Sequence, residues 1–139
     1  MSDGSGDGAS TPTVAQLTRE FFAAIDERDP ERMLAVLAPH AVFRALPHSP
    51  AIRTSDEVVA YFGSVVSSYP GARWSVTDVI DDGVRATVQF VVREFSTGHN
   101  REVISEQVAI VRATGGKITS IVGYYDTTEF RRLFWDEDA

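Results

Sequence analysis

The chain has 139 residues, the length of a single domain, and its content of 43% hydrophobic and 24% charged residues is typical of a soluble globular protein. Its net charge of -7, with no cluster of Lys or Arg, argues against a nucleic-acid or anionic-membrane partner. The lack of cysteine excludes disulfides, a thiolate nucleophile and cysteine metal sites. Because no apolar run has the length of a membrane span and the N-terminus lacks a signal-peptide pattern, we expect a cytoplasmic protein.

The chain is expected to begin with a polar tail followed by a helix. Residues 1–12 are rich in Gly, Ser and Asp and predict a disordered tail, which leaves a single domain over residues 13–135. Apolar side chains recur at helical spacing over residues 14–28, which indicates an amphipathic helix.

Two further helices and a strand follow. Asp29 can cap a short helix that begins at Pro30, a residue suited to the first helical position, and ends at Pro39. Residues 41–46 alternate like a strand. Residues 54–57, "TSDE", form a capping box that predicts the start of a third helix.

The second half of the chain predicts a sheet, because three turn signals separate four strand-like segments. These segments span residues 72–80, 84–95, 102–113 and 117–125. The second segment is apolar at alternate positions from Val84 to Val92, whereas the third is apolar on both faces and does not indicate which face is buried. Asp126 is expected to cap a short C-terminal helix.

This order predicts an α+β fold in which three N-terminal helices cover one face of a long, curved, antiparallel or mixed sheet. A curved sheet wrapped over helices makes a cone with a hollow centre.

Two stretches resemble one superfamily. "REFFAAIDERDPERMLAVLAPHAVF" (residues 19–43) and "GGKITSIVGYYDTTEFRRLF" (residues 115–134) are similar to the SnoaL-like branch of the NTF2-like, or ketosteroid-isomerase-like, superfamily. The resemblance implies one apolar pocket inside the cone and a homodimer packed through the sheet. Polyketide cyclases, steroid isomerases, epoxide hydrolases, dehydratases and ligand binders share this fold, so the resemblance does not decide the chemistry.

The resemblance also implies which side chains face the pocket. The implied inward residues are the alternate positions from Val84 to Val92 together with Glu94, Glu106, Val108, Ile110, Ile121, Gly123 and Tyr125. Periodicity alone supports this only for the segment that contains Val84 to Val92.

The acids of the resembling enzymes are missing at the matching positions. The base of the steroid isomerases falls at Ala45, their helix tyrosine at Phe21 and their second aspartate at or near Val108. The aspartate of many SnoaL-like cyclases falls at Gly123, and the arginine-bridged aspartate pair of the limonene-type epoxide hydrolases has no inward counterpart. Apolar side chains at these positions cannot abstract a proton or stabilise an enolate.

Glu106 is the candidate acid/base. It lies among apolar neighbours, where a carboxylate is costly unless it is used or paired. The expected hairpin registers place it opposite Val92 and Tyr125, so that a carboxylate and a phenol would share the pocket. A slip of one residue would instead turn Glu106 to solvent and Gln107 inward, and both readings stay open.

Tyr125 and His48 are the expected partners of this acid. Tyr125 is either a pocket phenol or an aromatic core residue, and His48 is either a proton carrier at the mouth of the cone or a solvated loop residue. The three histidines are scattered without metal-ligand spacing, so we expect no metal site, and we expect no cofactor.

The sequence therefore predicts a cofactor-independent cyclase, isomerase or dehydratase that acts on a hydrophobic polyketide- or terpenoid-like molecule. The alternatives are a non-catalytic binding protein with the same pocket and a dimeric interaction domain with an inert pocket. The expected substrate-binding residues are Phe21, Phe43, Tyr61, Phe62, Trp74, Val88, Phe90, Val92, Val108, Ile121 and Gly123.

Overall fold

The computed structural model describes residues 11–96 and 98–128. Three helices come first: α1 (Val14–Asp26), α2 (Pro30–Val36) and α3 (Ser55–Ser68). Each begins at a side-chain cap, because Thr13, Asp29 and Thr54 accept hydrogen bonds from backbone N–H groups of the first turn that have no partner inside the helix. The caps predicted at Asp29 and Thr54 are confirmed.

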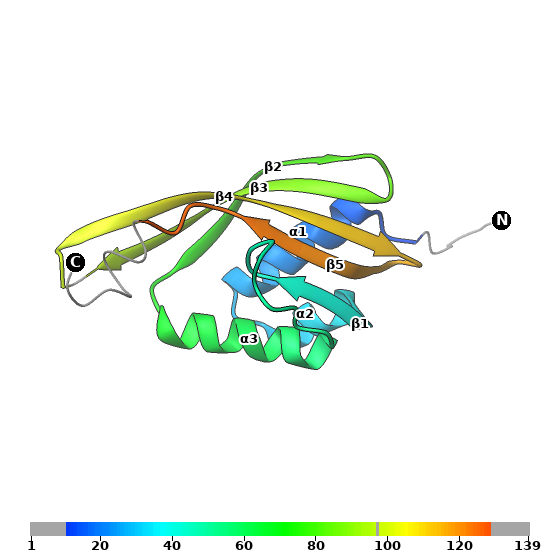
Figure 1. Cartoon of the computed structure of the whole chain (residues 1–139), viewed down its shortest axis with the longest axis horizontal. Helices are drawn as coiled ribbons and strands as arrows, with labels where there is room; N and C mark the ends of the chain where they lie inside the picture. Colours follow the sequence, from blue (N-terminus) through cyan, green and yellow to red (C-terminus); the bar gives the residue numbers. More distant parts are fainter. Residues whose placement is uncertain (1–10, 97, 129–139) are drawn as a thin grey trace.

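Five strands form one sheet. They are β1 (Leu37–Arg44), β2 (Arg73–Asp81), β3 (Arg85–Ser96), β4 (Arg101–Thr114) and β5 (Lys117–Tyr124). The strand order is β1-β5-β4-β3-β2, with β1 parallel to β5 and all other neighbours antiparallel. The helices lie together on one side of this sheet, which bends over them (Figure 1). The predicted α+β fold with a curved, mixed sheet is confirmed.

The core lies between the helices and the inner face of the sheet, which is the face turned toward them. α1 packs against β2, β3, β4 and β5, while α3 packs against β1 and α2. On β3 the alternation is as predicted, because Ala86, Val88, Phe90 and Val92 are all buried. Val84 was expected on this face as well, but it precedes the strand, follows the turn at Gly83 and is 58% exposed.

Of the two orientations of β4 that the sequence left open, the one with Glu106 inward is wrong and the one with Gln107 inward is confirmed. Glu106 pairs with Val91, not with Val92, and its side chain is exposed on the outer face. Val108 shares that face, whereas Gln107 turns inward. The cause is a register that differs by one residue from the expected one, and a shift of one residue exchanges the two faces of a strand.

The first strand begins earlier than expected. Leu37 follows α2 directly and pairs with Ile118 of β5, so Pro39 lies within β1 and does not end a helix. An irregularity between Leu37 and Val42 separates this first pair from the remaining ladder. Of the predicted tail, residues 1–12, only 11 and 12 are among the described residues. The predicted C-terminal helix lies beyond the described residues, except at its start. There the carboxylate of Asp126, the predicted cap, accepts a hydrogen bond from the backbone N–H of Thr128 at 2.9 Å.

The outer face of the sheet carries large apolar side chains in contact with solvent. Phe95, Ile104 and Tyr124 are all exposed there. This is the face through which the resemblance implies a homodimer, and that association stays a prediction.

Candidate functional site

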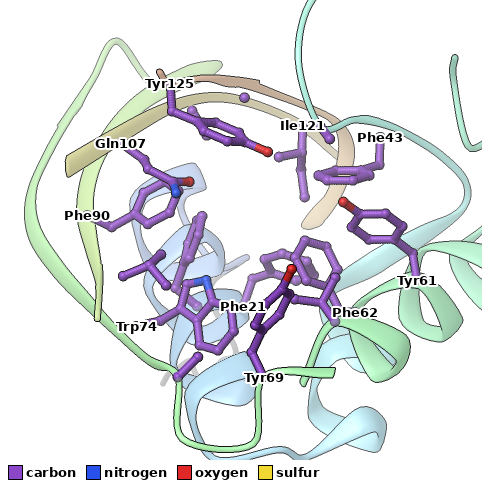
Figure 2. Close-up of a pocket in the computed structure, with 17 residues that line it drawn as sticks. Phe21, Phe43, Tyr61, Phe62, Tyr69, Trp74, Phe90, Gln107, Ile121 and Tyr125 are labelled. Carbon is purple, nitrogen blue, oxygen red and sulfur yellow. The ribbon is translucent and has the colours of Figure 1, made fainter. Parts of the chain in front are cut away.

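The inner face of the sheet and the helices enclose a cavity of about 170 Å³. Figure 2 shows the 17 side chains around it. They are Phe21, Phe22, Phe43, Ala45, Tyr61, Phe62, Val65, Tyr69, Ala72, Trp74, Phe90, Val92, Gln107, Ala109, Ile121, Gly123 and Tyr125. Nine of them are aromatic, so the wall is made mainly of ring faces and ring edges.

The helical side of the cavity is a cluster of packed rings. Phe21 of α1 meets Phe62 of α3 edge to face, with ring centroids 5.5 Å apart. Phe43 of β1 lies 5.0 Å from Phe62 and 5.1 Å from Tyr61. Aromatic pairs at these separations favour defined orientations, so this side of the cavity is formed before a ligand arrives.

The sheet side includes one close backbone approach. A Cβ built on Gly123 of β5 would overlap the carbonyl oxygen of Ala45 and would lie 3.3 Å from its carbonyl carbon. Because only glycine fits this close approach, Gly123 borders the cavity with its backbone alone.

The loop between α3 and β2, residues 69–72, is held by Arg28. Its guanidinium donates to the carbonyl oxygens of Pro70 at 3.0 Å and Ala72 at 2.6 Å. Arg28 has a left-handed backbone, with φ of 56°, and its guanidinium carbon lies 5.7 Å from the centre of the Trp74 ring. Arg28 therefore positions both the loop that carries Tyr69 and the adjoining Trp74.

A second contact fixes the start of β2. Asp26, at the end of α1, accepts hydrogen bonds from the Arg73 guanidinium at 2.6 and 2.8 Å and from the backbone N–H of Trp74 at 2.9 Å. Hydrogen bonding to Arg73 lowers the pKa of Asp26, so this carboxylate stays charged and occupied.

Phenols, one indole and one carboxamide are the polar groups of the wall. Figure 2 shows the hydroxyl groups of Tyr61, Tyr69 and Tyr125 directed into the cavity. Burial, together with the neighbouring phenols, raises the pKa of Tyr125 to about 12 and also raises the pKa of Tyr61. At neutral pH Tyr61 and Tyr125 are therefore protonated and can donate hydrogen bonds.

Gln107 holds the position that was predicted for the acid. The register that pairs Val108 with Tyr124 and Phe90 with Gln107 brings its carboxamide between Phe90 and Tyr125. Its Nε2 donates to Ser105 Oγ at 3.1 Å.

Most of the predicted binding residues reach the cavity. Those that line it are Phe21, Phe43, Tyr61, Phe62, Trp74, Phe90, Val92, Ile121, Gly123 and Tyr125. Val88 is buried but does not line it, and Val108 is half-buried on the outer face. His48 and Glu106 are exposed and do not line the cavity. The predicted acid/base role of Glu106 required an inward side chain, and the side chain points outward.

Seven wall residues are not among the predicted site residues, although an inward Gln107 was one of the two orientations left open for β4. They are Phe22, Ala45, Val65, Tyr69, Ala72, Gln107 and Ala109. Gln107 and Ala109 follow from the orientation of β4. The two faces of that strand differ in charge, because Glu102, Glu106 and Arg112 share the outer face, whereas the one charged residue of β4 with inward parity is Arg101 at the start of the strand. This difference in charge indicates the correct orientation.

Over residues 11–96 and 98–128, no group of three His, Asp or Glu side chains is placed to hold a metal ion. In the same part of the chain, no helix combines the length and the apolar character needed to cross a membrane.

The chain is similar to known proteins over nearly all of this fold. The family model for the SnoaL-like domain matches residues 18–121. An NTF2-like protein of unknown function from Burkholderia pseudomallei K96243 is 26% identical, covering 90% of this chain and 98% of its own, with a TM-score of 0.74. No curated protein matches the chain.

Two putative polyketide cyclases share the fold at lower identity. The protein from Xanthomonas campestris pv. campestris is 19% identical, covering 86% of this chain and 95% of its own, with a TM-score of 0.68. The putative SnoaL-like polyketide cyclase from Jannaschia sp. CCS1 is 13% identical, covering 92% of this chain and 97% of its own, with a TM-score of 0.75.

Proposed function

This chain belongs to the family of SnoaL-like domains, and from that premise we propose that it is a small-molecule binding protein for a compact aromatic compound that carries oxygen. The make-up of the cavity is the observation that carries the proposal. Nine of its 17 wall residues are aromatic, and none of the 17 bears a carboxylate, an imidazole, an ammonium or a guanidinium group. Such a wall desolvates an apolar ring and orients it with a few polar contacts.

The size of the cavity favours a small ligand. An engineered apolar cavity of about 150 Å³ holds benzene. The cavity here, about 170 Å³, is only slightly larger, so we expect its interior to take a one- or two-ring compound.

The phenols define the polar part of the ligand. Because the pKa of Tyr125 is about 12, its hydroxyl is neutral at pH 7 and donates a hydrogen bond without accepting a proton. A carbonyl, phenolic or alcohol oxygen on the ligand would accept that bond. In an apolar setting, leaving such a donor unpaired is costly, so this contact contributes to specificity.

The second candidate is the predicted cyclase, isomerase or dehydratase. The two putative polyketide cyclases with this fold favour it, as does the capacity of phenol donors to stabilise an enolate. Holding a flexible substrate in a reactive conformation would supply further rate. It ranks second because no wall residue can accept a proton at neutral pH.

A pair of substitutions on adjacent residues of β4 tests the binding site. Ala109 is buried in the wall, and Ala109→Phe would place a ring inside the cavity. Val108 lies beside it on the outer face, so Val108→Phe adds a similar side chain outside the cavity. The probe is 1-naphthylmethanol, and its affinity is measured by isothermal titration calorimetry.

We expect Ala109→Phe to weaken binding of 1-naphthylmethanol at least about tenfold, while Val108→Phe leaves it within about threefold of the original. Circular dichroism and the cooperativity of unfolding are measured for both variants to test whether each is folded. Equal affinity of the Ala109→Phe variant would place the binding site elsewhere and overturn the proposal. Chemical turnover of bound candidates, followed by mass spectrometry, would favour the enzyme.

A further inference from the structure

Glu94 is a buried carboxylate that the cavity wall does not include. Its side chain is 8% exposed, and it is the one charged residue among the buried residues of the described chain. It follows Phe90 and Val92 on the inner face of β3, and both of those residues line the cavity. Glu94 is therefore the next inward side chain along β3 beyond the wall.

The carboxylate of Glu94 lies against the loop that Arg28 holds. A Cβ built on Gly71 would stand 2.8 Å from Glu94 Oε1 and 3.8 Å from Oε2. Because Gly71 has no side chain, the carboxylate can approach the loop this closely. Gly71 lies between Tyr69 and Ala72, which both line the cavity. The carboxylate therefore lies beside the loop whose residues Tyr69 and Ala72 border the cavity. We call this region the Glu94 edge and define it by Tyr69, Ala72, Val92 and Glu94.

This buried charge has little compensation. Glu94 Oε1 accepts the N–H of Phe95 at 2.8 Å, and no described residue donates to Oε2. Across the ladder stands Val103, which is buried and apolar. No described cation forms an ion pair with Glu94, while Arg28 donates to loop carbonyls and Arg73 pairs with Asp26.

A buried carboxylate with an unused oxygen is costly, and native structures retain such groups where a ligand, an ion or a mechanism uses them. We propose that Glu94 receives the cationic nitrogen of an amine-bearing aromatic ligand whose ring fills the cavity. This inference rests on the proposed binding function and names the charge of its ligand.

Two properties of the molecule point to a cation. Aromatic faces attract cations, and Tyr69 belongs to the Glu94 edge. Trp74, in the adjoining wall, already has the Arg28 guanidinium 5.7 Å from its ring centre. The net charge of -7 favours the approach of a cation and opposes that of an anion. A ligand carboxylate at this edge would lie close to the Glu94 carboxylate, and like charges repel.

Three probes of one shape separate the ligand charge from the cavity itself. They are 1-naphthylmethylammonium, 1-naphthylmethanol and 1-naphthoate, titrated calorimetrically at pH 7. We expect the ammonium to bind about tenfold more tightly than the alcohol, since a charge-assisted hydrogen bond is worth that much, and the carboxylate to bind most weakly.

Glu94→Gln is the decisive variant, because its amide oxygen can still accept the Phe95 N–H while the charge is removed. We expect it to bind the alcohol as before and to lose the preference for the ammonium. Glu106→Gln is the matched control, because it removes one negative charge from the exposed outer face and should keep the preference.

The outcomes distinguish the two proposals. If the original protein binds the alcohol but shows no preference for the ammonium, or if the preference survives in the Glu94→Gln variant, the assignment of Glu94 is wrong and the binding function stands. If the alcohol itself does not bind, the binding function fails, and the inference fails with it. Loss of the preference in both variants would indicate a general charge effect and would also overturn the role of Glu94.

Discussion

Gly123→Ala tests whether the close approach of β5 to Ala45 shapes the cavity. The added Cβ would overlap the Ala45 carbonyl oxygen by about 1 Å, taking an ordinary carbon–oxygen separation as roughly 3.3 Å. Both partners belong to the backbone, so no side-chain rotation can relieve the overlap. Overpacking costs about 1–3 kcal/mol, and we expect this site at the upper end, near 3 kcal/mol.

Urea denaturation followed by circular dichroism measures this cost. With a slope of about 2 kcal/mol per molar urea, the midpoint should fall by roughly 1.5 M. Gly63→Ala is the control, because a Cβ there meets no atom within 4 Å and the residue lies within α3. Helix propensity predicts that this second change stabilises the protein by about 0.5–1 kcal/mol.

An unfolding free energy for the Gly123→Ala variant within about 0.5 kcal/mol of the original would refute the steric argument. It would mean that the segment containing Ala45 yields without cost. The position would then be open to an acidic side chain, and a variant carrying aspartate at residue 123 would become a direct way to ask whether the cavity supports acid/base chemistry.

Three further measurements address the phenols, the loop and the outer face. The pKa of Tyr125 in the folded protein, about 12, exceeds its ordinary value of 10, so the stabilising contribution of this side chain is complete below pH 10 and is lost as the pH rises through 12. A spectrophotometric titration should show one tyrosine with a midpoint near 12 that is absent from the Tyr125→Phe variant. Ionisation of Tyr125 near pH 10 would contradict its burial. Arg28→Lys cannot reach several loop carbonyls at once, so we expect affinity for 1-naphthylmethanol to fall about three- to tenfold, and unchanged affinity would show that the loop holds its own shape. If the implied homodimer forms through the outer face, Ile104→Glu should yield monomers in light scattering, whereas a dimer that persists would place the interface elsewhere.

The fold followed from the sequence wherever one signal was unambiguous. β3 alternates cleanly because it has one buried and one exposed face, and its burial from Ala86 to Val92 agrees with the prediction. The caps at Asp29 and Thr54 depend on local hydrogen bonds that the sequence itself specifies. The start of β1 was missed because its pairing with Ile118, about 80 residues away, is not a local property.

The site was less predictable because its chemistry depends on the orientation of a single strand. β4 carries apolar residues on both faces, so hydrophobic periodicity does not orient it. The turn between β3 and β4 sets the register, and the observed register differs by one residue from the one that would turn Glu106 inward, so Gln107 is inward instead. The cavity therefore contains a carboxamide where the acid/base hypothesis requires a carboxylate. Tyr69 and Ala72 were missed for another reason, since Arg28 brings their loop to the cavity through contacts distant in sequence.

The polar groups of the cavity interior differ in chemistry from the carboxylate at the Glu94 edge. In the interior, Tyr61 and Tyr125 are neutral phenols that donate hydrogen bonds and cannot take up a proton. At the Glu94 edge, the Glu94 carboxylate offers acceptor oxygens, one of which has no described donor. A ligand that satisfies both groups would carry an oxygen acceptor for a phenol and a nitrogen donor for Glu94. Binding and catalysis then differ in one respect: catalysis would require the Glu94 carboxylate to reach a substrate proton, whereas binding requires only that it pair with the ligand's charge.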